Sequence, residues 1–205
     1  MAVIATTLAA AALVAFPPPQ LSVGAEIRTD VGPVILSLDV GHAPVSTCNF
    51  LRYARAGQYR GARFFRTVVS ATNANPHPID VIQAETTAGS DDPGLGPIPL
   101  ERTRDTGLNH LAGTISMARN GPDTATSSFF IVTEDTPALD FGGGRHPDGQ
   151  GFAAFGQVVE GLDLVRTIQR RPAVDEQLVT PVAITDIVLR SPVPEICAAI
   201  FPEAE

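Results

Sequence analysis

The feature that most limits the fold of this chain is a series of short β-rich segments separated by polar, Gly-rich and Pro-rich stretches. Alternating apolar and polar residues at 26–39 predict a β-hairpin with its turn at Asp30-Val31-Gly32-Pro33. Further strands are predicted at residues 62–69, 81–84, 114–118, 128–133, 153–158 and 182–189.

Apolar residues instead recur every three positions at 44–56 and 162–169, which predicts two helices. The strands and helices do not alternate regularly, as they would in a parallel βαβ sheet. This order predicts a mainly β fold, a closed or nearly closed antiparallel barrel whose open ends the two helices cover. The long irregular segments that begin at Ser70 and Thr86 are candidates for a binding surface.

Length and charge exclude several classes of protein. The 205 residues fit one domain, and no apolar run is long enough to cross a membrane as a helix. The net charge of −8 argues against nucleic-acid binding, which needs a clustered cationic surface. All 14 cationic residues are arginine, so chemistry that requires a lysine, such as a Schiff base or a P-loop, is excluded.

Both ends of the chain differ in composition from the part between them. Residues 2–16 are small and apolar, like the hydrophobic region of a signal peptide, and three prolines follow them. We therefore expect a leader at 1–23, a single domain at 24–191 and a C-terminal tail at 192–205. The leader predicts a periplasmic or secreted protein, although no basic residue precedes Arg28. Without a functional signal, the protein would stay in the cytoplasm.

Cys48 and Cys197 are the only cysteines, and their spacing excludes a CxxC redox motif or a zinc ribbon. In an oxidising compartment they could form one disulfide between the Pro-rich tail and the helix at 44–56. Alternatively, both are unpaired thiols, and Cys48 is a small buried hydrophobe. The sequence leaves both alternatives open.

Motifs for metal binding or hydrolysis are missing from the sequence. The four histidines lack HExxH spacing, and the acidic residues do not cluster around them, so no metal site is expected. Residues 141–151 are Gly-rich but lack GxGxxG spacing, which favours a loop whose glycines adopt positive φ. Ser127 and Ser128 do not lie in a GxSxG elbow, which argues against a hydrolase triad.

Several short motifs follow one another in a specific order. They are Phe64-Phe65-Arg66, Val81-Ile82-Gln83, Gly113-Thr114-Ile115-Ser116-Met117-Ala118-Arg119, Ser128-Phe129-Phe130-Ile131, Leu139-Asp140 and Phe155-Gly156. In this order and spacing, residues 26–190 resemble the cyclophilin family of peptidyl-prolyl cis-trans isomerases. The resemblance implies an eight-stranded antiparallel barrel capped by two helices, with the substrate groove on its outer face and no cofactor.

The reaction that the resemblance implies is rotation about an X-Pro peptide bond. Amide resonance gives this rotation a barrier of roughly 18–20 kcal/mol, and the twisted transition state leaves a localised lone pair on the prolyl nitrogen. A guanidinium aimed at that nitrogen, or at the adjacent carbonyl, stabilises the twisted state more than the planar state. Arg66 matches the family's catalytic arginine, and Gln83 matches the glutamine that orients it.

Other positions match the residues with which the family holds its substrate. Phe130 and Leu139 correspond to the proline pocket, although periodicity alone would assign them to an ordinary core. In the same pocket Val81 replaces the usual Met and Phe152 the usual His. The stretch that binds the peptide backbone, mainly through main-chain groups, corresponds to Ala118, Arg119 and Asn120.

The chain departs from the family's pattern at several positions. Aligned on Gln83, Asp80 takes the place of the usual pocket Phe, and Ala84 replaces a glycine. Ser128 stands where glutamine is common, and Ala138 stands where many members carry the Trp that helps to bind cyclosporin. Two functions therefore remain open. The first is an exported isomerase that assists protein folding, and the alternative is a weakly active or inactive module that binds proline-containing segments. In either case the partners are proline-containing polypeptides, and we expect a monomer.

Overall fold

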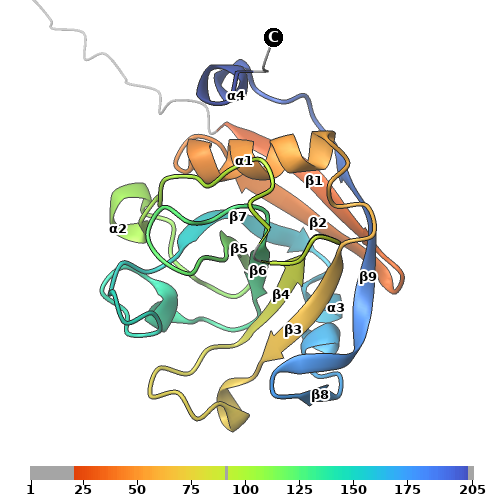
Figure 1. Cartoon of the computed structure of the whole chain (residues 1–205), viewed down its shortest axis with the longest axis vertical. Coiled ribbons are helices and arrows are strands. Elements are labelled where there is room, and N and C mark those ends of the chain that lie inside the picture. Colours follow the sequence, from red (N-terminus) through yellow and green to blue (C-terminus); the bar gives the residue numbers. More distant parts are fainter. Residues whose placement is uncertain (1–20, 91, 203–205) are drawn as a thin grey trace, which may run out of the picture.

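The computed structural model describes residues 21–90 and 92–202, which form a closed antiparallel β-barrel (Figure 1). Its strands are β1 (Ser22–Thr29), β2 (Gly32–Asp39), β3 (Arg63–Val68), β4 (Val81–Glu85), β5 (Thr114–Met117), β6 (Phe129–Val132), β7 (Ala153–Glu160), β8 (Ala173–Val174) and β9 (Gln177–Leu189). Neighbouring strands follow the order β1-β2-β7-β5-β6-β4-β3-β9-β8, and a pairing between β1 and β9 closes the barrel. All of these pairings are antiparallel. The predicted eight-stranded barrel is confirmed, with the short strand β8 added beside β9.

The described part of the chain also contains four α-helices. They are α1 (Pro44–Arg55), α2 (Thr103–Thr106), α3 (Leu162–Gln169) and α4 (Glu195–Ile200), with short 3-10 helices at Ser70–Thr72 and Pro137–Leu139. The two predicted helices correspond to α1, at the upper end of the barrel in Figure 1, and α3, at its lower end. The sequence did not predict α2 and α4 because such short helices give no clear apolar periodicity.

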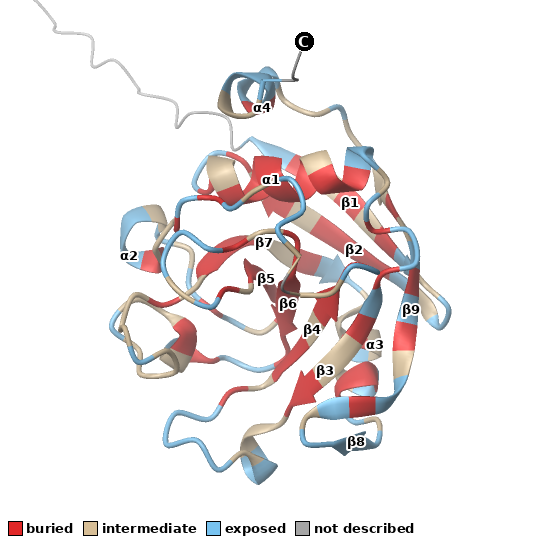
Figure 2. Cartoon of the chain, viewed as in Figure 1, coloured by how far each residue is buried: buried red, intermediate tan, exposed pale blue. Residues whose placement is uncertain are grey.

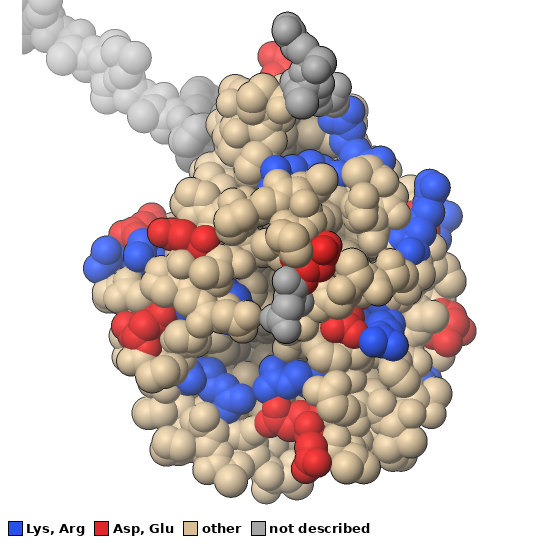
Figure 3. All heavy atoms as spheres, viewed as in Figure 1, with Lys and Arg blue, Asp and Glu red and all other residues tan. Residues whose placement is uncertain are grey.

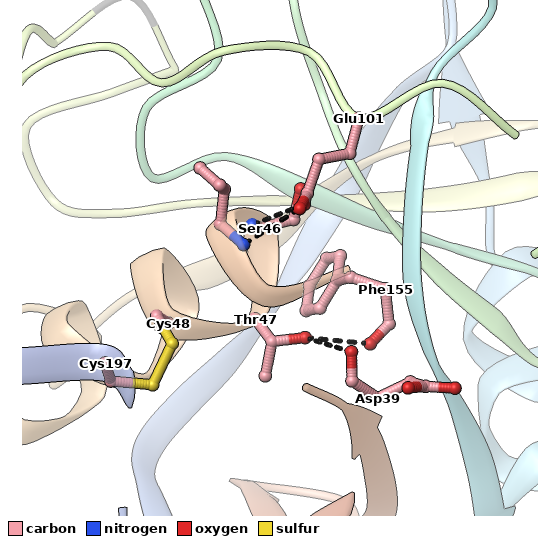
Figure 4. The surroundings of a disulfide bond; sticks show 8 residues. Asp39, Ser46, Thr47, Cys48, Glu101, Phe155 and Cys197 are labelled. Atoms are coloured by element: carbon pink, nitrogen blue, oxygen red, sulfur yellow. Dashed lines mark hydrogen bonds between the residues drawn. A yellow bond between two sulfur atoms is a disulfide. The ribbon is translucent and has the colours of Figure 1, made fainter. Parts of the chain in front are cut away.

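The first turn of α1 is capped by a carboxylate from a distant segment. Glu101 accepts hydrogen bonds from Val45 N at 2.9 Å and from Ser46 N at 2.7 Å (Figure 4). These two N–H groups have no partner within the helix, and a negative charge at a helix N-terminus also interacts favourably with the helix dipole. The long segment that contains Glu101 is therefore fixed to the upper end of the barrel.

Side chains that alternate along the strands build two separate apolar clusters. On β6, Phe129 and Ile131 point into the barrel, whereas Phe130 and Val132 belong to a smaller cluster on its outer face. Inside, Phe129 packs edge-on against Phe50 of α1, with ring centroids 5.4 Å apart. Figure 2 shows buried residues along the strands of the barrel and on the side of α1 that faces them. One face of these strands thus stabilises the fold, which leaves the other free to form a site.

Strand β9 begins at Gln177, before the predicted start at 182. The predicted strand, at 182–189, begins just after Pro181, a residue that has no N–H to donate to a neighbouring strand. In the structure, the pairing between β3 and β9 shifts register at this point: Phe64 pairs with Val182, and Arg66 pairs with Gln177. A bulge of this kind tolerates proline, so the strand continues through it and reaches β8.

Strand β1 begins inside the segment predicted to be a leader. It starts at Ser22, and Val23 is buried and paired with Leu38 of β2. The last residues of the predicted leader at 1–23 are therefore part of the barrel, whereas residues 1–20 lie outside the described part of the chain. No helix in the described segments 21–90 and 92–202 has the length and apolar character needed to cross a membrane.

The C-terminal tail is attached covalently to α1. Cys48 of α1 and Cys197 of α4 form a disulfide, with their Cα atoms 5.1 Å apart (Figure 4). Of the two alternatives that the sequence left open, the structure contains the disulfide. The guanidinium carbon of Arg52 also lies 3.9 Å from the centre of the Phe201 ring, which adds a cation–π contact between α1 and the tail.

Candidate active site

The smaller apolar cluster forms the floor of a groove on the outer face of the barrel. This outer cluster consists of Val68, Ile79, Val81, Phe130, Val132 and Leu139, with Ala118, Ala138 and Phe152 packed against it. Strands β4 and β6 are paired here, with Val81 opposite Val132 and Gln83 opposite Phe130. Because successive side chains of a strand point to opposite faces, every second residue of β4 and β6 points toward the groove.

A cavity of about 240 Å³ opens over the outer cluster. All nine residues predicted to bind or act on the substrate line it, namely Arg66, Val81, Gln83, Ala118, Arg119, Asn120, Phe130, Leu139 and Phe152. Figure 3 shows a hollow near the middle of the face drawn, with basic and acidic side chains side by side below it. Folding therefore brings together in one cavity residues that lie far apart in the sequence.

The guanidinium of Arg66 is held on two sides. Its Nη1 donates a hydrogen bond to Gln83 Oε1 at 2.8 Å. Its Nε and Nη2 both donate to Glu176 Oε2, and the Nε bond is 3.0 Å long. The side chain of Arg66 is 27% exposed, so its charge remains accessible from the cavity. The result is a permanently charged donor in a fixed orientation at the edge of an apolar slot.

Gln83 connects Arg66 to the end of strand β6. The side-chain amide of Gln83 donates from Nε2 to Ser128 Oγ at 3.2 Å, and Ser128 Oγ donates to the carbonyl of Ala84 at 2.8 Å. Since the amide nitrogen of Gln83 has this partner, its carbonyl oxygen faces the guanidinium. The geometry is thus the one required of a residue that orients Arg66.

The sequence and the fold both match known proteins. Residues 25–189 match the family described as cyclophilin type peptidyl-prolyl cis-trans isomerase. The chain belongs to the cyclophilin family. A peptidyl-prolyl cis-trans isomerase of Streptomyces antibioticus is 34% identical over 149 residues, which cover 70% of this chain and 81% of the relative. Peptidyl-prolyl cis-trans isomerase B of Escherichia coli is 31% identical over 147 residues, or 69% of this chain and 81% of the relative.

A solved structure supports the cyclophilin fold in particular. The crystal structure of a Cryptosporidium parvum cyclophilin type peptidyl-prolyl cis-trans isomerase matches with a TM-score of 0.65. The two sequences are 22% identical, and the match covers 84% of this chain and 100% of the other. At this low identity the likeness carries over the barrel architecture alone.

Aromatic rings line the apolar part of the cavity in this cyclophilin. Phe152 meets Phe130 edge-on, with ring centroids 5.5 Å apart and an interplanar angle of 87°. The main chain holds Phe152 there, because its N–H donates to the carbonyl of Leu139 at 2.9 Å. Phe152 therefore occupies part of the apolar side of the cavity.

A buried histidine supports the other side of Phe130. The His110 ring stacks on Phe130 at 5.9 Å, and its Nδ1 and Nε2 lie 2.7 Å from Asp140 Oδ1 and 2.9 Å from Ser116 Oγ. Burial lowers the pKa of His110, although the hydrogen bond that His110 makes to the carboxylate of Asp140 acts in the opposite direction. A neutral ring with its proton on Nδ1 satisfies both neighbours.

The lowered pKa of His110 predicts a pH dependence of stability. Below the ordinary histidine pKa the unfolded chain binds a proton that the folded protein does not, so stability falls as the pH decreases from about 7 toward 5. One such proton contributes at most about 1.4 kcal/mol per pH unit. Urea unfolding of the wild type and of His110→Gln at several pH values measures this slope. We expect a shallower slope in the variant, and equal slopes would contradict the prediction.

Arg119 lines the cavity, but its charged end points into the protein. Its side chain is 1% exposed and donates from Nη1 and Nη2 to the two carboxylate oxygens of Asp148, at 2.7 and 2.9 Å. Its Nε donates to the carbonyl of Gly151 at 2.8 Å, and these bonds fix the predicted Gly-rich loop against the slot. The hydrogen bonds from Arg119 hold the pKa of Asp148 well below its usual range. The guanidinium of Arg119 is therefore occupied within the protein, and only the main chain of Arg119 is left for a contact in the cavity.

The main chain of Asn120 has a partner in the same loop. Its carbonyl oxygen lies 3.2 Å from Nε2 of His146, whose other ring nitrogen is 3.0 Å from Asp148 Oδ1. The side of the groove next to Ala118 is thus tied to the Gly-rich loop through His146.

The predicted place of Asp80 in the pocket is wrong. Its carboxylate accepts hydrogen bonds from Ser70 N at 3.0 Å and from Gln169 Nε2 at 3.2 Å, and Asp80 does not line the cavity. Ile79 lines the cavity instead. Residues 79, 81 and 83 are two positions apart, so their side chains point to the same face of the chain. The slot therefore keeps an apolar wall where the alignment on Gln83 had placed a carboxylate.

Several residues of the groove were not predicted from the sequence. Glu176 reaches Arg66 from the β8–β9 turn, and Arg145 lines the cavity and donates to Asn73 Oδ1 at 3.1 Å. Ser90, Thr124, Thr126 and His146 also line the cavity. They come from turns and loops, where no periodicity indicates which side chains meet. In the described residues 21–90 and 92–202, no group of three His, Cys, Asp or Glu side chains is placed to hold a metal ion.

Proposed function

We propose that this groove accelerates rotation about X-Pro bonds of polypeptide segments, with Arg66 as the electrostatic catalyst and the outer cluster as the proline slot. The observation that carries the proposal is the pairing of a fixed guanidinium with an open apolar slot in one cavity. The slot takes up an apolar ring, and the few polar groups around it determine the orientation of the bound segment.

The chemistry requires no proton transfer and no covalent bond to the enzyme. In the planar amide the lone pair of the prolyl nitrogen is delocalised, and it becomes a better hydrogen-bond acceptor as the bond twists. An N–H of Arg66 that donates to this lone pair, or to the adjacent carbonyl, therefore binds the twisted state more tightly than the planar one. Because Gln83 and Glu176 already hold the guanidinium, it needs little reorganisation during the reaction.

The assay that tests the proposal is protease-coupled cleavage of an X-Pro peptide. We expect the purified wild type to speed the conversion of the cis to the trans isomer. The alternative, a binding module with little or no turnover, predicts peptide binding without this acceleration. Asp80 and Ala84 suggested that alternative, but Asp80 lies outside the slot and Ala84 belongs to the interior core. Wild-type protein that binds the peptide without accelerating its isomerisation would contradict the proposal.

We also propose that the protein is exported to the periplasm or the medium, where it assists the folding of other proteins as a monomer. The Cys48–Cys197 disulfide supports this location, since disulfides persist in oxidising compartments and are rare in the cytosol. N-terminal sequencing of protein isolated from each cell fraction tests it, with size-exclusion chromatography for the monomer. We expect an exported chain cut before β1, because Val23 is buried in the barrel. A full-length cytosolic chain with two free thiols would contradict export.

Ala138 predicts weak inhibition by cyclosporin. It is half-buried beside the outer cluster, at the position where many family members carry a Trp. Without the indole, the drug loses a large apolar contact and a hydrogen-bond donor. Titration of cyclosporin into the isomerase assay measures this, and Ala138→Trp is expected to increase the inhibition. Nanomolar inhibition of the wild type would show the prediction to be wrong.

A further inference from the structure

Glu176 occupies a backbone conformation that its residue type disfavours. It is the second residue of the two-residue turn that joins β8 to β9, where Asp175 has φ of 48° and Glu176 has φ of 65°. Turns with positive φ at both positions favour Asn or Asp followed by Gly, and Glu has neither their small size nor their local hydrogen bonds. A residue keeps such a backbone conformation only when its contacts with the surrounding structure compensate for the strain.

Those contacts bring three segments of the chain together. The carbonyl of Glu176 accepts a hydrogen bond from Thr67 N of β3 at 2.8 Å, which fixes the turn to the catalytic strand. Its Oε2 accepts from Nε and Nη2 of Arg66, and its Oε1 accepts from Asn73 Nδ2 at 2.6 Å. Main chain and side chain of Glu176 are therefore both anchored beside Arg66.

The pattern of these bonds determines which donors of Arg66 face the substrate. A guanidinium has five N–H groups, of which Glu176 accepts one from Nε and one from Nη2, and Gln83 accepts one from Nη1. One N–H of Nη1 and one N–H of Nη2 are left by these three bonds. They are the donors that remain for a prolyl nitrogen or its neighbouring carbonyl.

We infer that Glu176 is a positioning residue for the isomerase reaction, which fixes the guanidinium of Arg66 so that its remaining N–H groups are available to the bound proline. The inference rests on the proposed role of Arg66. A purely stabilising role does not explain the arrangement, because the Arg66 and Glu176 side chains are 27% and 33% exposed and ion pairs at such sites contribute little to stability. Holding one flexible side chain in its reactive rotamer, by contrast, acts directly on the rate.

The test compares Glu176→Ala with Asp175→Ala, a matched change in the same turn. Asp175 is exposed and forms no part of the cavity that holds the proline slot. We expect Glu176→Ala to lower kcat about 10-fold, with KM changed less than about twofold, because Arg66 then samples unproductive orientations. The Nε–H resonance of Arg66 in the NMR spectrum is expected to shift and broaden in the same variant. Asp175→Ala is expected to leave kcat and this resonance unchanged.

The outcomes separate this inference from the proposed function. If Arg66→Ala abolishes most of the activity but Glu176→Ala keeps the wild-type kcat or the wild-type Arg66 resonance, the inference is overturned and the role of Arg66 stands. An equal loss in Asp175→Ala also overturns it, because the turn rather than the carboxylate would then be responsible. If Arg66→Ala leaves activity unchanged, the proposed function itself fails. Should Glu176→Ala not fold by circular dichroism, Glu176→Leu provides the same test, because leucine fills similar space without an acceptor for Arg66.

Discussion

Replacing Arg66 with alanine is expected to lower kcat/KM on an X-Pro peptide by about 100- to 1000-fold, the range seen when a preorganised transition-state donor is removed. The loss should fall mainly on kcat, because the proposed proline slot, which Phe130 and Leu139 help to form, stays intact. The protease-coupled assay measures the rate, and isothermal titration of a peptide measures the affinity. Arg66→Lys is expected to recover little activity, since an ammonium is a compact point donor without the planar fork that Gln83 and Glu176 hold.

Arg60→Ala is the matched control for this experiment. Arg60 is an exposed arginine that lies 3.5 Å from Asp186 and does not line the cavity. Its removal changes the net charge of the protein by the same amount and should leave kcat/KM within about twofold of the wild type. Activity of Arg66→Ala equal to that of Arg60→Ala would rule out the electrostatic mechanism, whatever the wild-type rate.

Removal of the Cys48–Cys197 disulfide is expected to reduce the free energy of unfolding by about 2–4 kcal/mol. The bond joins residues separated by 149 positions, so it closes a loop that contains most of the unfolded chain and lowers the conformational entropy of that loop. A loop of this length gives up to about 5 kcal/mol in the chain-entropy account, and release of the short tail in the folded state offsets part of that. Urea unfolding of the wild type and of the Cys48→Ala, Cys197→Ala double variant, without reductant, measures the difference.

Reductant supplies the control for the disulfide. Dithiothreitol should shift the wild type toward the double variant and leave the double variant unchanged. Isomerase activity is expected to survive in both, because neither cysteine lines the cavity over the outer cluster. A stability difference below about 0.5 kcal/mol, no larger than that of an ordinary surface substitution, would contradict the prediction.

The reach of sequence reasoning differs between strands and loops. Alternation along 128–133 predicted the strand, but only the resemblance of its motif to the cyclophilin family assigned Phe130 to the pocket, and the structure places Phe130 in the cluster on the outer face of β6. The same alternation could have assigned the pocket wall to Ile79, because it precedes Val81 and Gln83 by even steps. Alignment across the inserted loop pointed to Asp80 instead. Asp80 is an odd number of positions from Gln83, so its side chain lies on the opposite face of the chain.

Other features depend on contacts between segments that have no pattern in common. Glu176 is 110 positions from Arg66, in a two-residue turn, and nothing in the sequence around it shows that its carboxylate faces the guanidinium. Whether Cys48 and Cys197 form a bond was equally open, because the distance between two thiols depends on where the tail packs against α1.

The sequence by itself determined the antiparallel barrel and its two main helices, because period and turn residues are properties of neighbouring positions in the chain. Nine residues that line the cavity were named only through the resemblance of local motifs to the cyclophilin family. Only the tertiary structure decided how the cationic side chains of the groove are arranged. Arg119 is turned inward onto Asp148, whereas Arg66 is held at the cavity by Gln83 and Glu176. The physical reason is that hydrogen bonds and ion pairs act over a few ångströms in space, and closure of the barrel alone determines which distant residues come that close.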